Sequence, residues 1–316
     1  MKAPRMAESI LNTREQVASI WSLGGLTPKQ LVRRVWQSAM EDNLLGRASE
    51  LAYNFIFAVF PLMLFLLSLF GLFASRGATL KSNLMFYLQT GLPPAAYDLL
   101  NKTISEVTRN TSGGKLTFGI IFTLWVASGG TNSMISTLNA VYGVSDGRPW
   151  WKVRALAVEL TAALAVLVIS ALGVVLIGGF VAHWTGSHFH LGLAAVWTWK
   201  ILQWPVALFF IAVSFSLIYF FGPDLKEQHW YWITPGSLVG VLLWLIVSFG
   251  FRAYLHFFNS YSKTYGSLGA AIILLFWFYM TGFAFLMGGE INAQIEHAAA
   301  EHGHPEAKAE GQKMAA

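Results

Sequence analysis

Six long apolar stretches constrain the fold of this chain more than any other feature of its sequence. Each holds about 20 or more residues, and at a rise of about 1.5 Å per residue such a helix crosses the roughly 30 Å hydrocarbon core of a bilayer. Strands of a membrane barrel would be shorter and would alternate apolar with polar residues. The sequence therefore predicts an all-α membrane protein with six transmembrane helices, at 51–73, 117–141, 155–182, 197–221, 231–255 and 268–293.

Composition agrees with lipid as the solvent of this chain. Hydrophobic residues make up 55% of its 316 residues and charged residues only 12%, about half the charged share of a typical soluble domain. The chain has no cysteine, which excludes disulfides, thiolate metal sites and cysteine nucleophiles. Its first 46 residues hold no apolar core of a cleavable secretory signal, so an internal helix is expected to lead insertion.

Lysine and arginine residues predict the orientation of the helices. Of these 21 residues, 13 fall on the side that holds both chain ends and 8 on the other side. Because cytoplasmic loops carry the excess of basic residues, both termini are predicted to be cytoplasmic. The basic residues are dispersed at helix ends, which favours anionic lipid headgroups over nucleic acid as a partner.

The predicted spans divide the chain into a cytoplasmic N-terminal segment, 1–46, a transmembrane domain, 47–296, and a disordered cytoplasmic tail, 297–316. The loop 74–116 between the first two spans is predicted to be partly helical and extracytoplasmic. Residues 27–43 begin with Thr-Pro, a good helix start, and mix apolar with basic residues. An interfacial amphipathic helix is the preferred interpretation of this segment, and a soluble-domain helix is the alternative.

The second span carries the most polar residues. Ser128, Asn132, Ser136 and Asn139 recur at spacings of four, four and three, which places them on one helix face that we expect to point inward. Such groups either hold helices together by hydrogen bonds or line a hydrated path, and both readings stay open.

Ionisable residues and a proline mark the first and last spans. Glu50, Asn54 and Pro61 fall on one side of the first span, where Pro61 is expected to bend the helix. Five charged residues are expected at one depth near the cytoplasmic side, where they either gate a path or only fix helix register. This predicted ionic cluster consists of Arg47, Glu50, Arg154, Glu159 and Glu290.

Motifs of nucleotide binding and hydrolysis are missing from the sequence. It has no phosphate-binding loop ending in Lys-Ser or Lys-Thr, no His-Glu-x-x-His and no Gly-x-Ser-x-Gly. ATP-driven transport is therefore not expected, nor is catalysis, and no metal site or cofactor is predicted.

Gly236 and Gly240, four residues apart in the fifth span, predict close packing against another helix.

Several motifs resemble the YihY/virulence factor BrkB family of bacterial inner-membrane proteins over roughly residues 30–296. These are Ala48-Ser49-Glu50-Leu51-Ala52-Tyr53-Asn54 with Phe60-Pro61, Tyr265-Gly266-Ser267-Leu268-Gly269-Ala270, and Gly288-Gly289-Glu290-Ile291-Asn292. The resemblance implies a six-helix inner-membrane protein and a transporter-like role for a lipid or another amphipathic molecule. The family also carries an old ribonuclease BN label, but the four aspartates of this sequence form no motif suited to holding catalytic metals.

Three functions follow from these observations. The leading one is a non-ATPase transporter or flippase-like protein for a lipid or another envelope molecule. The alternative is an envelope-assembly scaffold that binds a partner through its outer loop, and a membrane-bound nuclease ranks last. The partners considered besides membrane lipid are a second copy of the chain, in a homo-oligomer, and an envelope protein. The predicted polar path or gate consists of Glu50, Asn54, Pro61, Ser128, Asn132, Ser136, Asn139, Glu290 and Asn292.

Overall fold

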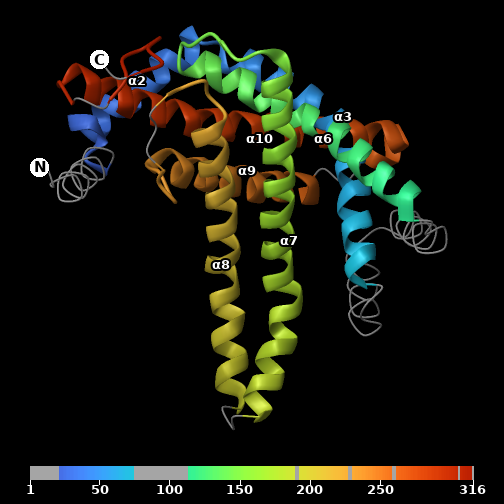
Figure 1. Ribbon diagram of the computed structural model, residues 1–316. Coiled ribbons are helices and arrows are strands. Elements are labelled where there is room, and N and C mark those ends of the chain that lie inside the picture. Colours follow the sequence, from blue (N-terminus) through green and yellow to red (C-terminus); the bar gives the residue numbers. More distant parts are fainter. Residues whose placement is uncertain are drawn as a thin grey trace, which may run out of the picture. The chain divides into compact units, whose positions relative to one another are not determined.

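Helices make up all the regular secondary structure that a computed structural model of the chain describes. The description covers residues 21–74, 113–188, 192–226, 230–257, 261–304 and 307–314. The predicted all-α class is therefore confirmed for these residues (Figure 1). In chain order the elements are η1 (Leu23–Gly25), α2 (Pro28–Glu41), α3 (Leu44–Ala74), α6 (Gly113–Val141), α7 (Trp150–His188), α8 (Gly192–Phe221), α9 (Pro235–Phe257) and α10 (Tyr261–Glu301).

Each predicted span coincides with a long helix, from α3 for the first to α10 for the sixth. Four helical segments within the described residues are long and apolar enough to cross a membrane. They correspond to the third to sixth predicted spans, whereas the full number of six and the orientation stay predictions. Most of the predicted outer loop, residues 75–112, lies outside the described residues. The four membrane-crossing segments are Trp150–Val174, Trp197–Phe221, Pro235–Tyr254 and Ala271–Glu301.

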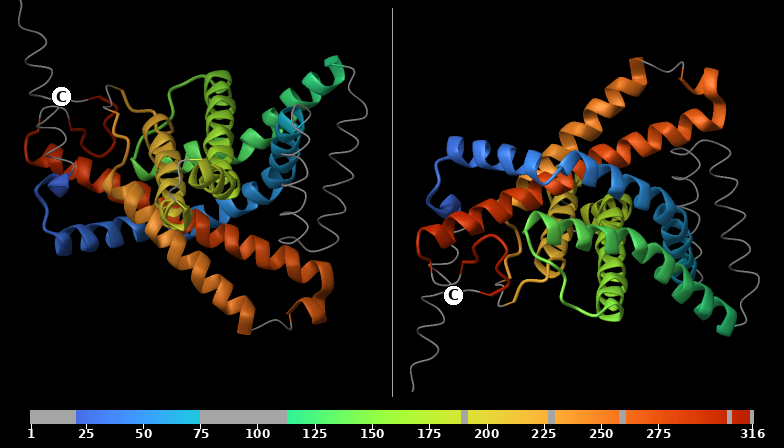
Figure 2. Two further views of the ribbon diagram at one scale, coloured as in Figure 1. Left: turned by 90° about the horizontal axis from the view of Figure 1, so that it is seen from below. Right: turned by 90° about the horizontal axis from the view of Figure 1, so that it is seen from above.

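The chain forms two compact units. Unit 1 is drawn from Met1–Ile56, Asn132–Leu156 and Ile211–Ala316, and unit 2 from Phe57–Thr131 and Ala157–Phe210. Within unit 2, the parts of α7 and α8 that belong to it run side by side in opposite directions (Figures 1 and 2).

Unit 2 also contains a polar contact between helices. The hydroxyl oxygens of Thr131 in α6 and Thr161 in α7 lie 2.8 Å apart, and Thr161 donates to the carbonyl of Ala157 one turn earlier. Hydroxyl pairs of this kind hold transmembrane helices together.

Helix α10 is the central element of unit 1, where it packs against η1, α2 and α9. Figure 2 shows α2 crossing α10 near the C-terminal part of the latter. The core at this crossing is apolar because side chains one turn apart on each helix lie on the same face. Its buried members are Leu26, Leu31 and Val35 from the N-terminal segment with Ile291, Ile295 and Ala298 from α10.

Helices α9 and α10 approach closely where both carry glycine. A Cβ atom at Gly236 would collide with the carbonyl oxygen of Gly288, and one at Gly240 would come within 3.1 Å of the Tyr219 hydroxyl. That hydroxyl donates to the carbonyl oxygen of Phe285 at 2.6 Å. The predicted packing role of Gly236 and Gly240 is therefore confirmed, and it joins α8, α9 and α10.

Helix α2 begins with the predicted Thr-Pro start. Thr27 accepts a hydrogen bond from the backbone N–H of Gln30, whose side chain in turn accepts from the backbone N–H of Thr27. One face of α2 is buried on α10, while Val32, Trp36 and Met40 are exposed along a second face. The interfacial position of this helix remains a prediction.

Replacing Thr27 with alanine should loosen α2. The substitution removes one half of the reciprocal cap, a loss that typically costs about 1 kcal/mol of helix stability. We expect faster amide hydrogen exchange across the first turns of α2 and unchanged exchange in α7, measured by mass spectrometry in detergent. Equal exchange in the two proteins would show that the cap contributes nothing.

The C-terminal tail differs from the disordered segment predicted for 297–316. Residues 297–301 continue α10, in which His297, Ala298 and Ala299 are buried. The described residues 307–314, which we call the C-terminal segment, lie against the rest of unit 1. Lys308 is buried there with its ammonium 3.5 Å from a carboxylate oxygen of Glu296. Residues 297–301 are therefore helical, where composition had predicted disorder.

Candidate functional site

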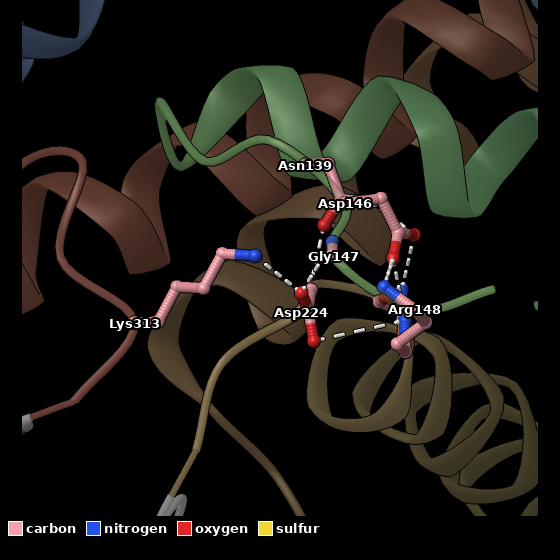
Figure 3. A network of polar contacts seen from close by, with 7 residues as sticks. Asn139, Asp146, Gly147, Arg148, Asp224 and Lys313 are labelled. Atoms are coloured by element: carbon pink, nitrogen blue, oxygen red, sulfur yellow. Dashed lines mark hydrogen bonds and ion pairs between the residues drawn. The ribbon is translucent and has the colours of Figure 1, made fainter.

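A network of polar side chains joins three segments at one end of unit 1 (Figure 3). Asn139, near the end of α6, donates to Asp146 at 2.9 Å and accepts from the backbone N–H of Asp224 at 2.7 Å. Arg148 donates to both carboxylate oxygens of Asp146 and to the carbonyl oxygen of Gly222. The α6–α7 and α8–α9 connections are therefore held to each other through side chains.

The C-terminal segment completes this network. The Lys313 ammonium lies 2.5 Å from Asp224 Oδ2, which also accepts from the backbone N–H of Gly147. The backbone N–H of Lys226 donates to the carbonyl oxygen of Lys313, and that of Gly311 donates to the carbonyl oxygen of Tyr142. The C-terminal segment thus runs across the end of α6 and is bonded both to that end and to the α8–α9 connection.

Charge pairing determines the ionisation of both aspartates in the network. Partial burial alone would raise the pKa of Asp224, but the hydrogen bonds and charge of Lys313, with Gly147 and Arg148, outweigh it and lower that pKa. The pKa of Asp146 is lowered in the same way, since bonds from Arg148 and Asn139 outweigh its burial. Both carboxylates therefore stabilise the fold in their charged form.

Stability should fall at acidic pH because of this network. A carboxyl whose pKa is lower in the folded than in the unfolded protein stabilises the fold above its ordinary pKa, here 3.8, and that contribution is lost as the pH falls through the lowered folded value. We expect Asp224→Asn to lower the thermal unfolding midpoint at pH 7. Between pH 5 and 3, the midpoint of this variant should fall less than that of the wild type. The exposed Glu41 offers a control as Glu41→Gln. Parallel pH profiles for Asp224→Asn and wild type would contradict this account.

Asn292 forms a second polar clamp, at the start of α9. Its carbonyl oxygen accepts from the backbone N–H of Gly236 at 2.9 Å and its amide nitrogen donates to the hydroxyl of Thr234 at 3.0 Å. The first backbone N–H groups of a helix lack partners within the helix. Asn292 therefore positions the start of α9 on α10.

Glu290 is a fully buried carboxyl within the segment of α10 that is apolar enough to cross a membrane. Its Oε1 accepts a hydrogen bond from the Gln294 side chain at 3.0 Å, and its Oε2 has no hydrogen-bond partner among the described residues. The glycines before it pack on other helices, Gly288 on α9 and Gly289 on Leu138 of α6. An ionisable side chain with an open oxygen at such a place is costly and marks a candidate functional site.

The four polar residues that were predicted to share an inward face of the second span are not all buried. Ser128 and Asn139 are buried and Asn132 is half-buried, but Ser136 is exposed. The other buried polar side chains of this stretch are those of Thr131, Ser133 and Thr137.

Residues predicted on the first span have different surroundings. Asn54 donates to the hydroxyl of Ser133, which joins α3 to α6 within unit 1. Glu50 is exposed, and Pro61 lies inside α3 and is half-buried. Asn54 thus makes a helix–helix contact of the kind expected for polar residues in lipid.

Members of the predicted ionic cluster also differ in their environment. Arg47 donates from Nε to the carbonyl oxygen of Asp42, while Glu50 and Glu159 are exposed. Glu290 is buried as described, and Arg154 is half-buried. The shortest oppositely charged contacts in the described residues instead join Lys313 to Asp224, Arg148 to Asp146 at 2.7 Å, and Arg34 to Glu301 at 2.8 Å.

Sequence reasoning identified Asn139 but missed the other members of the polar network and the partner of Glu290. These members lie in connections between helices and in the tail, outside the predicted spans: Asp146, Arg148, Asp224 and Lys313. The Asp-Gly-Arg and Pro-Asp turns at 146–148 and 223–224 were the available signal. Gln294 lies four residues after Glu290, a spacing that places two helical side chains next to each other.

Similarity to known proteins identifies the family. A family model described as virulence factor BrkB matches residues 35–312. The chain belongs to the virulence factor BrkB family. The putative ribonuclease-like protein YfkH of Bacillus subtilis is 31% identical over 250 residues, which cover 79% of this chain and 89% of that protein. The predicted resemblance to the BrkB family is therefore confirmed.

Other relatives of this BrkB-family chain are named only as membrane proteins. A UPF0761 membrane protein of Xanthomonas oryzae and one of Xanthomonas axonopodis are 27% and 26% identical to it. The matches cover 83% of this chain and 60% of each relative, so the chain spans less than two thirds of their length. No solved structure matches. Family membership and the apolar helices establish an integral membrane protein.

The Bacillus subtilis relative carries a ribonuclease-like function in its name. Among the residues that the structure describes, no group of three or more His, Asp or Glu side chains lies close enough to hold a metal ion. The outer loop on which the scaffold hypothesis depends lies largely outside the described residues.

Proposed function

We propose that this BrkB-family protein is a non-ATPase transporter or flippase-like protein of the bacterial inner membrane that moves a lipid or a similar amphipathic molecule. The observation that carries the proposal is Glu290, a fully buried carboxyl in an apolar helix with one oxygen that lacks a protein partner. A carboxyl that served only to hold helices together would be expected to use both oxygens. In the closed packing of this structure that oxygen is out of reach of solvent, and we propose that it binds an ion or a polar headgroup when the surrounding helices separate.

Polar groups around Glu290 support a path that handles a headgroup. Asn292 lies two residues further along α10, and α6 reaches the same level of α10 where Leu138 packs beside Gly289. Substrate sites of secondary transporters are likewise built from helix ends and polar groups. An apolar tail would remain in the surrounding lipid while the headgroup passes these residues.

The arrangement of aromatic and basic residues supports the proposed orientation. Trp150 and Trp151 are exposed where the membrane-crossing part of α7 begins, and the Lys152 ammonium lies 5.4 Å from the centre of the Trp151 ring. Tryptophan collects at membrane–water boundaries and lysine at the cytoplasmic one. The exposed Val32, Trp36 and Met40 face of α2 would rest on the same surface, near anionic headgroups.

Lipid movement in reconstituted vesicles tests the proposed function. Purified protein would be placed in vesicles of phosphatidylethanolamine and phosphatidylglycerol that contain a fluorescent phospholipid, and a membrane-impermeant reductant would report lipid that reaches the outer leaflet. We expect faster loss of inner-leaflet fluorescence than in vesicles with an unrelated six-helix protein. Equal rates in both preparations, with and without proton or sodium gradients, would contradict the proposal.

The absence of cysteine in the chain makes its topology testable in cells. Single cysteines at positions 29 and 310 should be labelled by an impermeant maleimide only after the inner membrane is opened, because both are proposed to be cytoplasmic. Labelling of either position in intact spheroplasts would contradict this orientation.

A further inference from the structure

The surroundings of the Glu290 carboxyl limit which ligand can bind to Oε2, the oxygen that has no hydrogen-bond partner among the described residues. Every atom of the residue is inaccessible to solvent, and the only hydrogen bond to the carboxyl within the described residues comes from the neutral amide of Gln294. A carboxylate removed from water without a cationic partner costs several kcal/mol. The closed packing around Glu290 therefore requires a bound cation or a proton.

Titratable groups that face Glu290 come from three other elements. Asp42 follows the end of α2 and Glu310 lies in the C-terminal segment, and both carboxyls interact electrostatically with Glu290. The buried ring of Tyr142, at the end of α6, packs edge-on against His297. The surrounding groups thus add negative charge or are neutral, which further disfavours a bare carboxylate at Glu290.

Basic side chains near this part of unit 1 are engaged elsewhere. Lys308 pairs with Glu296, one and a half turns beyond Glu290 on α10, and the Arg47 guanidinium donates to the carbonyl oxygen of Asp42. Arg34 pairs with Glu301 through two hydrogen bonds. None of these contacts brings positive charge to Glu290.

We infer that Glu290 is a proton-binding site, with the proton on Oε2, and that proton binding and release there drive the transport cycle. The first half stands on the geometry of Glu290 alone, and the second half rests on the proposed function. In the closed state the carboxylate takes up one proton from water to form the neutral acid. When the surrounding helices open, the carboxyl is hydrated and releases that proton to water. The resulting carboxylate can then accept a hydrogen bond from a headgroup amine or from another donor. A single metal ion is a poorer occupant because the described residues offer it few oxygen ligands besides Glu290.

Infrared spectroscopy tests the proton site without any transport. A protonated carboxyl that is buried away from water gives a carbonyl stretching band at a higher wavenumber than the bands of carboxylates and amides. We expect such a band at pH 7 in wild-type protein and its loss in Glu290→Gln, which keeps the shape of the side chain and its position beside Gln294. Glu50→Gln, which changes an exposed carboxyl, should keep the band. A wild-type spectrum without the band, or a band that survives in Glu290→Gln, would overturn the inference.

Gradients across reconstituted vesicles separate proton coupling from the proposed function itself. With an inside-acidic or inside-alkaline gradient, we expect lipid movement by the wild type to accelerate at least about threefold in one of the two directions, and Glu290→Gln to lose that acceleration. Lipid movement that responds to a sodium gradient but not to a proton gradient would overturn proton coupling while leaving the proposed function in place. No lipid movement under any gradient would contradict the proposed function and leave the spectroscopic test of the proton site valid.

Discussion

The substitution Gly236→Ala is expected to destabilise the protein by about 2 kcal/mol or more. A Cβ at this position would collide with the carbonyl oxygen of Gly288 and with the side-chain amide of Asn292. Backbone atoms cannot move aside without separating α9 from α10, and overpacked sites typically cost about 1–3 kcal/mol. Displacement of Asn292 would also break its hydrogen bonds to the start of α9, each of which contributes about 1 kcal/mol. Unfolding in mixed micelles with increasing dodecyl sulfate would measure the change.

Gly250 offers a matched control on the same helix. A Cβ there would meet no atom of the described residues within 4 Å outside its own turn of helix, so Gly250→Ala should be neutral or should stabilise α9 by up to about 1 kcal/mol through better helix propensity. Because the chemical change is the same at both positions, the difference isolates the close approach of α9 to α10. Equal unfolding midpoints for the two variants would show that these helices do not meet at Gly236.

Glu290→Gln is expected to slow lipid movement by about tenfold or more while the protein remains folded. The variant preserves the volume and a hydrogen bond to Gln294 but cannot exchange a proton. Interactions of charged groups contribute about 1.5–3 kcal/mol, and tenfold corresponds to about 1.4 kcal/mol. Lipid movement in vesicles would be measured after matching the amount of folded protein by its elution in gel filtration.

The control for this prediction is Glu41→Gln, at the exposed end of α2. It removes the same charge outside the membrane-crossing segments and should leave lipid movement within about twofold of wild type. If Glu290→Gln transports as fast as wild type and only its yield falls, Glu290 has a structural role alone. The functional reading of this residue would then be wrong.

Much of the fold could be predicted from the sequence because lipid imposes simple requirements. Backbone groups in a bilayer must be paired within a helix, so an apolar stretch such as 197–221 leaves little choice of structure, and α8 ends at the predicted residue, Phe221. The Thr27 cap and the glycines at 236 and 240 were also predicted correctly, because local chemistry and spacing specify each of them.

The long-range polar contacts could not be predicted in the same way. Asn139 and Asp224 are 85 positions apart, and Asp224 and Lys313 are 89 apart. Nothing local to a loop aspartate specifies which distant residue it will meet. Composition predicted a disordered tail, but residues 297–301 continue α10, and Lys308 and Lys313 pair with the distant Glu296 and Asp224.

Helical periodicity also failed to identify the buried side of α6. Spacing placed Ser128, Asn132, Ser136 and Asn139 on one face, yet Ser136 is exposed while Thr137 is buried. In a soluble helix the apolar side marks the core, but in lipid both sides of a helix are apolar. The polar residues that bond across helices, such as Ser133 with Asn54, are therefore found only once the neighbouring helices are placed.

A density map of the protein in lipid nanodiscs would test most directly whether Glu290 faces a transport path. We predict density for a lipid headgroup or an ordered water chain within hydrogen-bond distance of Glu290 Oε2 in at least one conformation, and its loss in Glu290→Gln. A map in which protein side chains fill all the space around that oxygen in every conformation would contradict the proposed path.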